Sequence, residues 1–175
     1  GTEGYSSCAG VATLASGALY VAGTFSATLD DVALSGTGSP VVSEGDDDVF
    51  VARFGTTGVP EIAWRFGDLF EQRAKAMGSD AAGRLYVLAE DSGTEGHGGV
   101  DLWLLVLSGD GHLTEERRYG TGNDETALAL AVAPDGSTAF AGTLTEPLDL
   151  GAGALGGDTF VAAFDPSGAP RWSHG

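Results

Sequence analysis

Cysteine and basic residues are scarce in this sequence. It contains one cysteine, Cys8, and only 8 lysines and arginines against 25 aspartates and glutamates. A single cysteine cannot form a disulfide within the chain, so cysteine usage says nothing about an oxidising compartment. The net charge of −17 repels polyanions over most of the surface, and we expect no nucleic-acid partner. No apolar run approaches the roughly 18 residues that a membrane span needs, so we expect no span.

The patterns that usually accompany catalysis or cofactor binding are also missing. His97, His112 and His174 lie at expected turns or at the chain end, and no two of them have a metal-ligand spacing. No nucleophile elbow and no cysteine–histidine arrangement is visible. The segment GAGALG, at 151–156, satisfies G-x-G-x-x-G, but it leads into an expected strand rather than opening a helix. We therefore expect no organic cofactor.

What the sequence has in abundance is glycine, arranged in a threefold repeat. The 29 glycines are spread along the chain, which indicates many tight turns rather than a linker. In each unit an aspartate opens an apolar strand (VFVARF, LWLLVL, TFVAAF), a turn glycine follows ten residues later, and a short strand ends in glycine. These positions are Asp48, Asp101 and Asp158, then Gly58, Gly111 and Gly168, then Gly67, Gly120 and Gly175.

The repeat predicts an all-β fold built from three four-stranded antiparallel units. In the third unit we expect strands at 126–133, 138–144, 159–165 and 170–173, because apolar residues alternate with period two. Only 68–81 has helical composition, and the repeat register places it on the first strand of the second unit. Sheets that are apolar on both faces need cover on both, which favours the blades of a β-propeller. A β-sandwich is the alternative, but it has no reason to repeat at a fixed period.

We expect one domain, 1–175, with blades at about 1–67, 68–120 and 121–175. The pattern Gly-x-Leu-Tyr-Val-x-Gly, then Gly-x-Asp-x-Phe-Val-Ala-x-Phe, a turn glycine and a closing Trp and Gly resembles the bacterial seven-bladed propeller repeats (SBBP type). That family is common in cell-surface and secreted proteins and in lipoproteins. The resemblance implies an extracellular, periplasmic or cell-surface location and a scaffold of varied roles. Arg117, where the other units have Trp, and the number of blades depart from the family.

Three blades are too few for a closed ring, since propellers typically use four to eight. We expect either further blades of the same protein or a second copy that completes a six-bladed ring. The favoured function is a non-catalytic scaffold or binding module with a protein or carbohydrate ligand. The alternative is a propeller enzyme of the lyase or hydrolase type, with a site at the channel mouth. A cluster of carboxylates or histidines converging there would favour the enzyme.

Two groups of side chains are candidates for specific roles. Asp46, Asp47 and Asp48 form the densest acidic cluster, and on a loop they would suit Ca²⁺; a solvated loop with one structural aspartate competes with this reading. Asp48, Asp101 and Asp158 recur once per unit, so we expect them to accept backbone N–H bonds before the third strand. The repeated aromatics, among them Trp64, Trp103 and Trp172, are expected between blades rather than as a sugar-stacking row.

Overall fold

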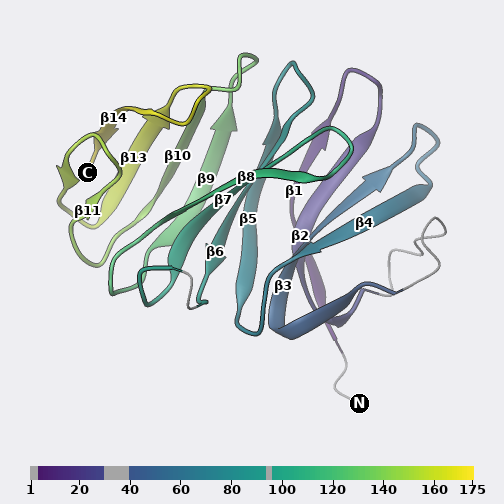
Figure 1. The fold of residues 1–175 in the computed structure, drawn as a ribbon, viewed down its shortest axis with the longest axis horizontal. Coiled ribbons are helices and arrows are strands. Elements are labelled where there is room, and N and C mark those ends of the chain that lie inside the picture. Colours follow the sequence, from purple (N-terminus) through teal and green to yellow (C-terminus); the bar gives the residue numbers. More distant parts are fainter. Residues whose placement is uncertain (1–3, 30–39, 94–95) are drawn as a thin grey trace.

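The protein is all-β in the computed structural model, which describes residues 4–29, 40–93 and 96–175 and contains no helix in those ranges (Figure 1). Three four-stranded antiparallel sheets follow one another along the chain, and a two-stranded hairpin is added to the third unit. This confirms the prediction of an all-β chain with three four-stranded antiparallel units. Gly1, which opens the first expected unit, lies outside the described residues.

Each sheet is a meander of neighbouring strands. The first sheet contains β1 (Ser6–Thr13), β2 (Leu19–Thr28), β3 (Val42–Phe54) and β4 (Pro60–Phe66). The second contains β5 (Gln72–Ser79), β6 (Leu85–Asp91), β7 (Asp101–Leu107) and β8 (Leu113–Tyr119). The third contains β9 (Thr126–Val132), β10 (Thr138–Thr143), β13 (Thr159–Phe164) and β14 (Pro170–His174). The hairpin is formed by β11 (Leu148–Asp149) and β12 (Ala154–Leu155).

The observed strands of the third sheet lie within a residue of the expected ones at each end, and the segment 68–81 contains strand β5 despite its helical composition. Its neighbours explain this result. β5 pairs along its length with β6 and lies between β1 and β9 of the adjacent sheets, so tertiary packing outweighs its intrinsic helix propensity. The GAGALG segment contributes strand β12 and opens no helix.

Six short hairpin turns share one backbone geometry. In each, the fourth residue after the strand is a glycine with a positive φ between 78° and 89°, and its N–H donates to the carbonyl three residues earlier. A side chain is strained in this left-handed region, so glycine is the natural choice. The glycines are Gly17, Gly58, Gly83, Gly111, Gly136 and Gly168.

The three sheets pack against one another in chain order, with their first strands β1, β5 and β9 adjacent (Figure 1). Between the first and second sheets the core includes Tyr20, Val51, Leu85 and Leu105. Between the second and third sheets Leu102 packs with buried aromatics of the third sheet, discussed below. The second sheet is therefore covered on both faces.

The sheets have two different ends. At the short-turn end, every connection is one of the six glycine turns. At the long-loop end, the connections between β2 and β3, β6 and β7, and β10 and β13 differ in length, and the last contains the hairpin β11–β12. Leu148, Leu150 and Leu155 of that connection pack into the core beside the second sheet. Loops that vary on a fixed scaffold are where binding residues concentrate, so the long-loop end is the place to look for a site.

Candidate functional site

The acidic cluster lies on strand β3 rather than on a loop. Asp46, Asp47 and Asp48 all fall inside β3, and Asp47 and Asp48 pair with Ser26 and Phe25 of β2. Successive side chains of a strand point to opposite faces, so Asp47 points away from its two neighbours. The three carboxylates are not brought together.

Arginines bind the two buried carboxylates of this cluster. Asp47 accepts from Arg73 Nε at 3.1 Å and from the Tyr5 hydroxyl. Asp48 accepts from Arg65 Nη1 at 3.1 Å. Within the described part of the chain, no three His, Cys, Asp or Glu residues are arranged to hold a metal ion. An arginine occupies the oxygens that Ca²⁺ would need, so this arrangement offers no shared calcium position.

The repeated aspartates stand at equivalent places in the three sheets, opposite Phe25, Asp91 and Leu144, and two of them accept a backbone N–H bond. Asp48 and Asp101 are buried, and each accepts the backbone N–H of the residue four earlier, Glu44 at 2.7 Å and His97 at 2.5 Å. Burial raises the pKa of both carboxyls despite these bonds. Asp158 is exposed, and its carboxylate makes no hydrogen bond within the described residues. In the third unit the aspartate is a surface charge.

Each buried aspartate lies against the closing glycine of its own sheet. A Cβ added to Gly67 would overlap Asp48 Oδ1, and one added to Gly120 would overlap Asp101 Oδ1. Both of these oxygens are buried and have no hydrogen-bond partner among the described residues. The glycine is therefore required by close approach of the carboxylate to the backbone.

A polar side chain from the next sheet completes each of these junctions. Gln72 Oε1 accepts from the Asp68 N–H at 3.0 Å, and Glu125 Oε2 accepts from the Thr121 N–H at 3.0 Å. Both acceptors are buried, and both lie beside the closing glycine. Burial raises the pKa of Glu125, and the nearby charge of Asp101 raises it further. Beside the closing glycine, the second junction thus has two buried carboxyl groups, Asp101 and Glu125, where the first has the Asp48 carboxyl group and the Gln72 amide.

The third unit departs from the repeat by two residues. Trp64 pairs with Val51, and its equivalent in the third sheet, which pairs with Val161, is His174 rather than Trp172. The residue equivalent to Arg65 is then Gly175. The alignment of the closing Trp and Gly across all three units was therefore wrong for the third. The side chains of β14 still point to the same faces as in the expected alignment, because a shift of two residues preserves the side-chain alternation.

A polar groove runs between β1 and β5 at the long-loop end. Its outer part, of about 640 Å³, is lined by Tyr5, Asp46, Asp47, Glu71 and Arg73 among others. Its inner part, of about 400 Å³, shares the tyrosine and the arginine. The additional side chains of the inner part include Ser7, Cys8, Thr24 and Lys75.

The groove walls are held together by hydrogen bonds between the two sheets. The Ala74 N–H donates to Thr24 Oγ1 at 3.0 Å, which ties β5 to β2. Arg73 forms ion pairs with both Asp47 and Glu71, so its guanidinium is fixed across the groove. The Tyr5 ring, 49% exposed, stands at the edge, and burial followed by the adjacent Asp47 raises its pKa. A ligand here would meet a half-exposed ring beside charged hydrogen-bonding groups.

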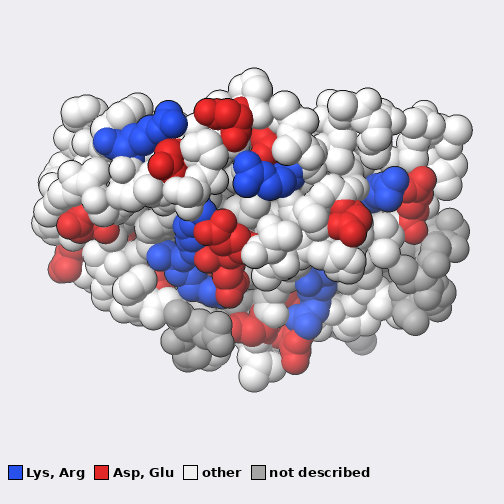
Figure 2. All heavy atoms as spheres, turned by 45° about the horizontal axis from the view of Figure 1, so that its top comes forward, with Lys and Arg blue, Asp and Glu red and all other residues white. Residues whose placement is uncertain are grey.

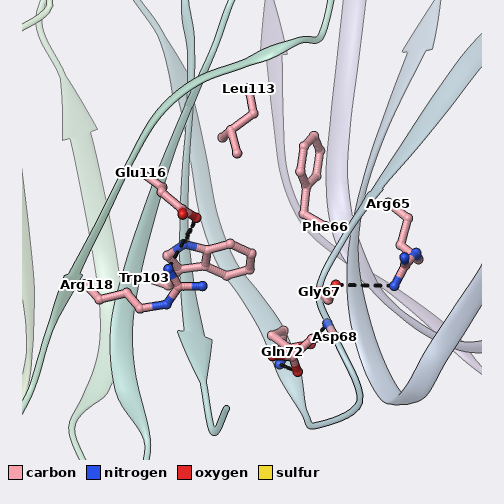
Figure 3. Close-up of a pocket in the computed structure, with 9 residues that line it drawn as sticks. All are labelled: Arg65, Phe66, Gly67, Asp68, Gln72, Trp103, Leu113, Glu116 and Arg118. Carbon is pink, nitrogen blue, oxygen red and sulfur yellow. Dashed lines mark hydrogen bonds and ion pairs between the residues drawn. The ribbon is translucent and has the colours of Figure 1, made fainter. Parts of the chain in front are cut away.

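A second hollow, of about 340 Å³, lies between the outer strands of the first two sheets (Figure 3). Trp103 lies at its base, donates from Nε1 to Glu116 at 3.0 Å, and has the Arg118 guanidinium 4.8 Å from its ring centroid. Arg118 also donates to Asp91 at 2.8 Å. In Figure 3 the Arg65 side chain points away from these groups. The polar groups of this hollow bind one another, which is typical of a junction between sheets.

The aromatic side chains do not form an exposed row. Trp103 is buried, and Trp64 packs on the core between the first two sheets and stacks on Tyr20 with ring centroids 6.5 Å apart. Only Trp172 is largely exposed, at 45%, and it lies on the third sheet, away from the groove. A sugar-stacking tryptophan row is therefore not formed.

Charge on the surface is mixed rather than gathered. On the face drawn in Figure 2, basic side chains lie beside acidic ones and form no continuous basic patch. The ion pairs Arg53–Glu61, Arg84–Asp80 and Arg117–Glu115 are examples. Among the residues that the structure describes there is no helix long and apolar enough to cross a bilayer.

Sequence reasoning missed Tyr5, Arg65 and Arg73, which organise the acidic cluster. The available signal was scarcity: with only 8 basic residues against 25 acidic ones, each arginine on a strand next to a buried aspartate is a candidate partner.

Comparison with protein-family models and with curated proteins finds no match for this chain.

Proposed function

We propose that the three sheets are consecutive blades of a β-propeller that serves as a non-catalytic binding scaffold of a bacterial surface or secreted protein. Packing of the sheets in chain order, with β1, β5 and β9 adjacent, supports this arrangement. The resemblance of the repeat to propeller repeats of surface proteins supports the location. In a propeller the first strands line the central channel, so the groove between β1 and β5 opens at the channel mouth.

The ligand that this groove fits best is a carbohydrate. The observation behind the proposal is the half-exposed Tyr5 ring beside Asp47 and Arg73, which form a fixed ion pair. A ring face packs on the C–H face of a sugar, while a carboxylate and a guanidinium bind its hydroxyl groups. Further hydrogen-bonding side chains, Ser7 and Lys75, line the inner part.

The enzyme alternative lacks support at this site. Asp47 and Glu71 both form ion pairs with Arg73, an arrangement that suits a structural ion pair rather than a general acid. The carboxyl groups whose pKa burial does raise, those of Asp48, Asp101 and Glu125, line none of the hollows described above. A substrate in the groove would not reach them.

Glycan-array screening of the 175-residue chain, followed by calorimetry with the best glycan, tests this proposal. We expect Arg73→Ala and Tyr5→Ala to weaken binding at least about tenfold, since each loses more than 1.4 kcal/mol of contact. Tyr5→Phe keeps the ring and should retain most of the affinity. Arg171→Ala, an exposed arginine on β14, is the matched control for charge. Absence of any glycan ligand, or equal affinity of all four variants, would overturn the proposal.

A further inference from the structure

The outward face of the third sheet is an unusually neutral surface for so acidic a chain. Cross-strand partners share a face, and the pairings of β9, β10, β13 and β14 define two rows of four residues on it. The rows are Ala131, Ala139, Ala163 and Trp172, then Ala129, Ala141, Val161 and His174. No acidic or arginine side chain stands in either row, although the chain carries a net charge of −17.

These rows correspond by register to the rows through which the first sheet contacts the second. Tyr20, Ala22 and Val51 of the first sheet occupy the corresponding places and are fully buried in the core between the sheets. Their counterparts in the third sheet are open: Val161 is 37% exposed. The Trp172 and His174 rings contact each other, with centroids 5.7 Å apart. The third sheet thus presents an interface surface without its partner.

A contact at the sheet edge repeats between successive sheets and then stops. The Trp64 ring of β4 packs on the turn at Gly111, and the Arg117 guanidinium of β8 packs on the turn at Gly168, where it also donates to the Ser167 carbonyl at 3.2 Å. The corresponding turn of the first sheet, at Gly58, has no described atom within 4 Å of an added Cβ. Among the described residues, the Gly58 turn therefore lacks the side chain that covers the other two turns. The exposed rings of β14 occupy the position of that side chain in the third sheet.

The outward face of the first sheet is also apolar. One cross-strand row contains Val11, Val21, Ala52 and Ala63, and Val11 is 63% exposed. Towards the long-loop end, Leu29 and Val41 pack over part of this face. In that row Ala52 and Ala63 are already buried, so the exposed part of the face that a partner can cover lies at Val11 on β1.

We propose that the outward face of the third sheet docks on the outward face of the first sheet of a second copy, with the β14 rings against the Gly58 turn. Because each copy has both faces, two copies close head to tail about a two-fold axis. The inference rests on the proposed propeller arrangement and names its partner. It continues the packing seen twice within the chain, and it covers both neutral faces at once.

Sedimentation of the 175-residue chain from micromolar to 100-micromolar concentration tests the docking. We expect a species of twice the 17.6 kDa chain mass. Added salt should strengthen it, because two copies of charge −17 repel each other outside the neutral contact. Trp172→Glu on the third sheet and Val11→Glu on the first should each raise the dissociation constant more than about tenfold. Leu69→Glu, at an exposed loop leucine away from both faces, should leave it unchanged.

Each alternative occupant gives a different result. A monomer at every concentration overturns the proposal, and so does a dimer that Trp172→Glu breaks but Val11→Glu does not, since that dimer joins two third sheets. Circular dichroism of each variant confirms that it is folded. The groove is separate from both faces, so glycan binding that survives in a monomer would leave the proposed function intact. Loss of glycan binding alone would leave the dimer intact.

Discussion

The junction between the first and second sheets and the junction between the second and third share a backbone but distribute charge differently. In the first, Arg65 binds Asp48 directly. In the second, the corresponding arginine, Arg118, binds Asp91 at 2.8 Å, and Asp101 accepts from the His97 N–H. The closing glycine and the buried aspartate are the same in both. The repeat therefore specifies close backbone packing, while its ion pairs can be exchanged between neighbouring positions.

The same difference extends to the side chain that enters from the next sheet. Gln72 is neutral and donates from Nε2 to both Asp68 and Asp91. Glu125 cannot donate when ionised, and it lies beside the unpartnered oxygen of Asp101. Two neighbouring buried carboxylates repel each other, which costs free energy, so the second junction is the less favourable of the two in its electrostatics.

The largest expected effect is loss of the closing glycine. Gly120→Ala places a Cβ on Asp101 Oδ1, and the buried strand cannot move aside, so we expect the free energy of unfolding to fall by about 3 kcal/mol. Gly122→Ala is the control, because a Cβ added there has no other described atom within 4 Å. Urea denaturation of both variants measures the difference. Equal stability of the two would show that Gly120 is not held by the aspartate.

The second-largest expected effect is a difference in stability between a variant at a buried aspartate and a variant at an exposed one. Asp48→Ala leaves the Glu44 N–H without its acceptor and removes one of the acceptors of Arg65, and we expect a loss of about 2 kcal/mol in the free energy of unfolding. Asp158→Ala removes an exposed charge and should change stability by less than about 0.5 kcal/mol. Thermal melting of the two variants beside the parent gives the comparison. A large loss of stability in Asp158→Ala would mean that Asp158 has the same structural role as Asp48 and Asp101.

The sequence predicted those features that depend on local pattern. Strands such as β9 and β10 follow from period-two alternation, and the six glycine turns follow from the need for positive φ. It did not predict the hairpin β11–β12, which is held by core contacts of Leu148 and Leu155 with the second sheet. Such contacts join residues far apart in the chain.

The two-residue shift in the third unit was hidden for a physical reason. Trp172 and the residue level with Trp64 point to the same face, so the apolar pattern is identical in either register. The site was missed in a similar way. Asp46 to Asp48 read as one acidic cluster in sequence, but strand alternation splits their side chains between two faces, and Arg73 reaches Asp47 from the neighbouring sheet.

The smallest expected effect tests the electrostatic contrast between the junctions. Glu125→Gln copies the first junction into the second: the amide can donate to Asp101 Oδ1, and one buried charge is lost. We expect a gain of about 1 kcal/mol in the free energy of unfolding at pH 7. The reverse exchange, Gln72→Glu, removes the donors to Asp68 and Asp91 and should destabilise the chain.

The pH dependence of this gain follows from the direction of the pKa shifts. Burial raises the pKa of both Glu125 and Asp101, so the folded state binds protons that the unfolded state releases above the ordinary glutamate value of 4.5. Ionisation therefore costs stability above the folded pKa, and that cost disappears as pH falls towards 4.5. Urea midpoints of Glu125→Gln and the parent should converge over this range. His97 Nδ1 lies 3.8 Å from Asp101, so repeating the comparison with His97→Asn in both backgrounds removes this imidazole from it. A stability gap that stays constant from pH 7 to pH 4.5 would mean that the two carboxyl groups do not share a strained site.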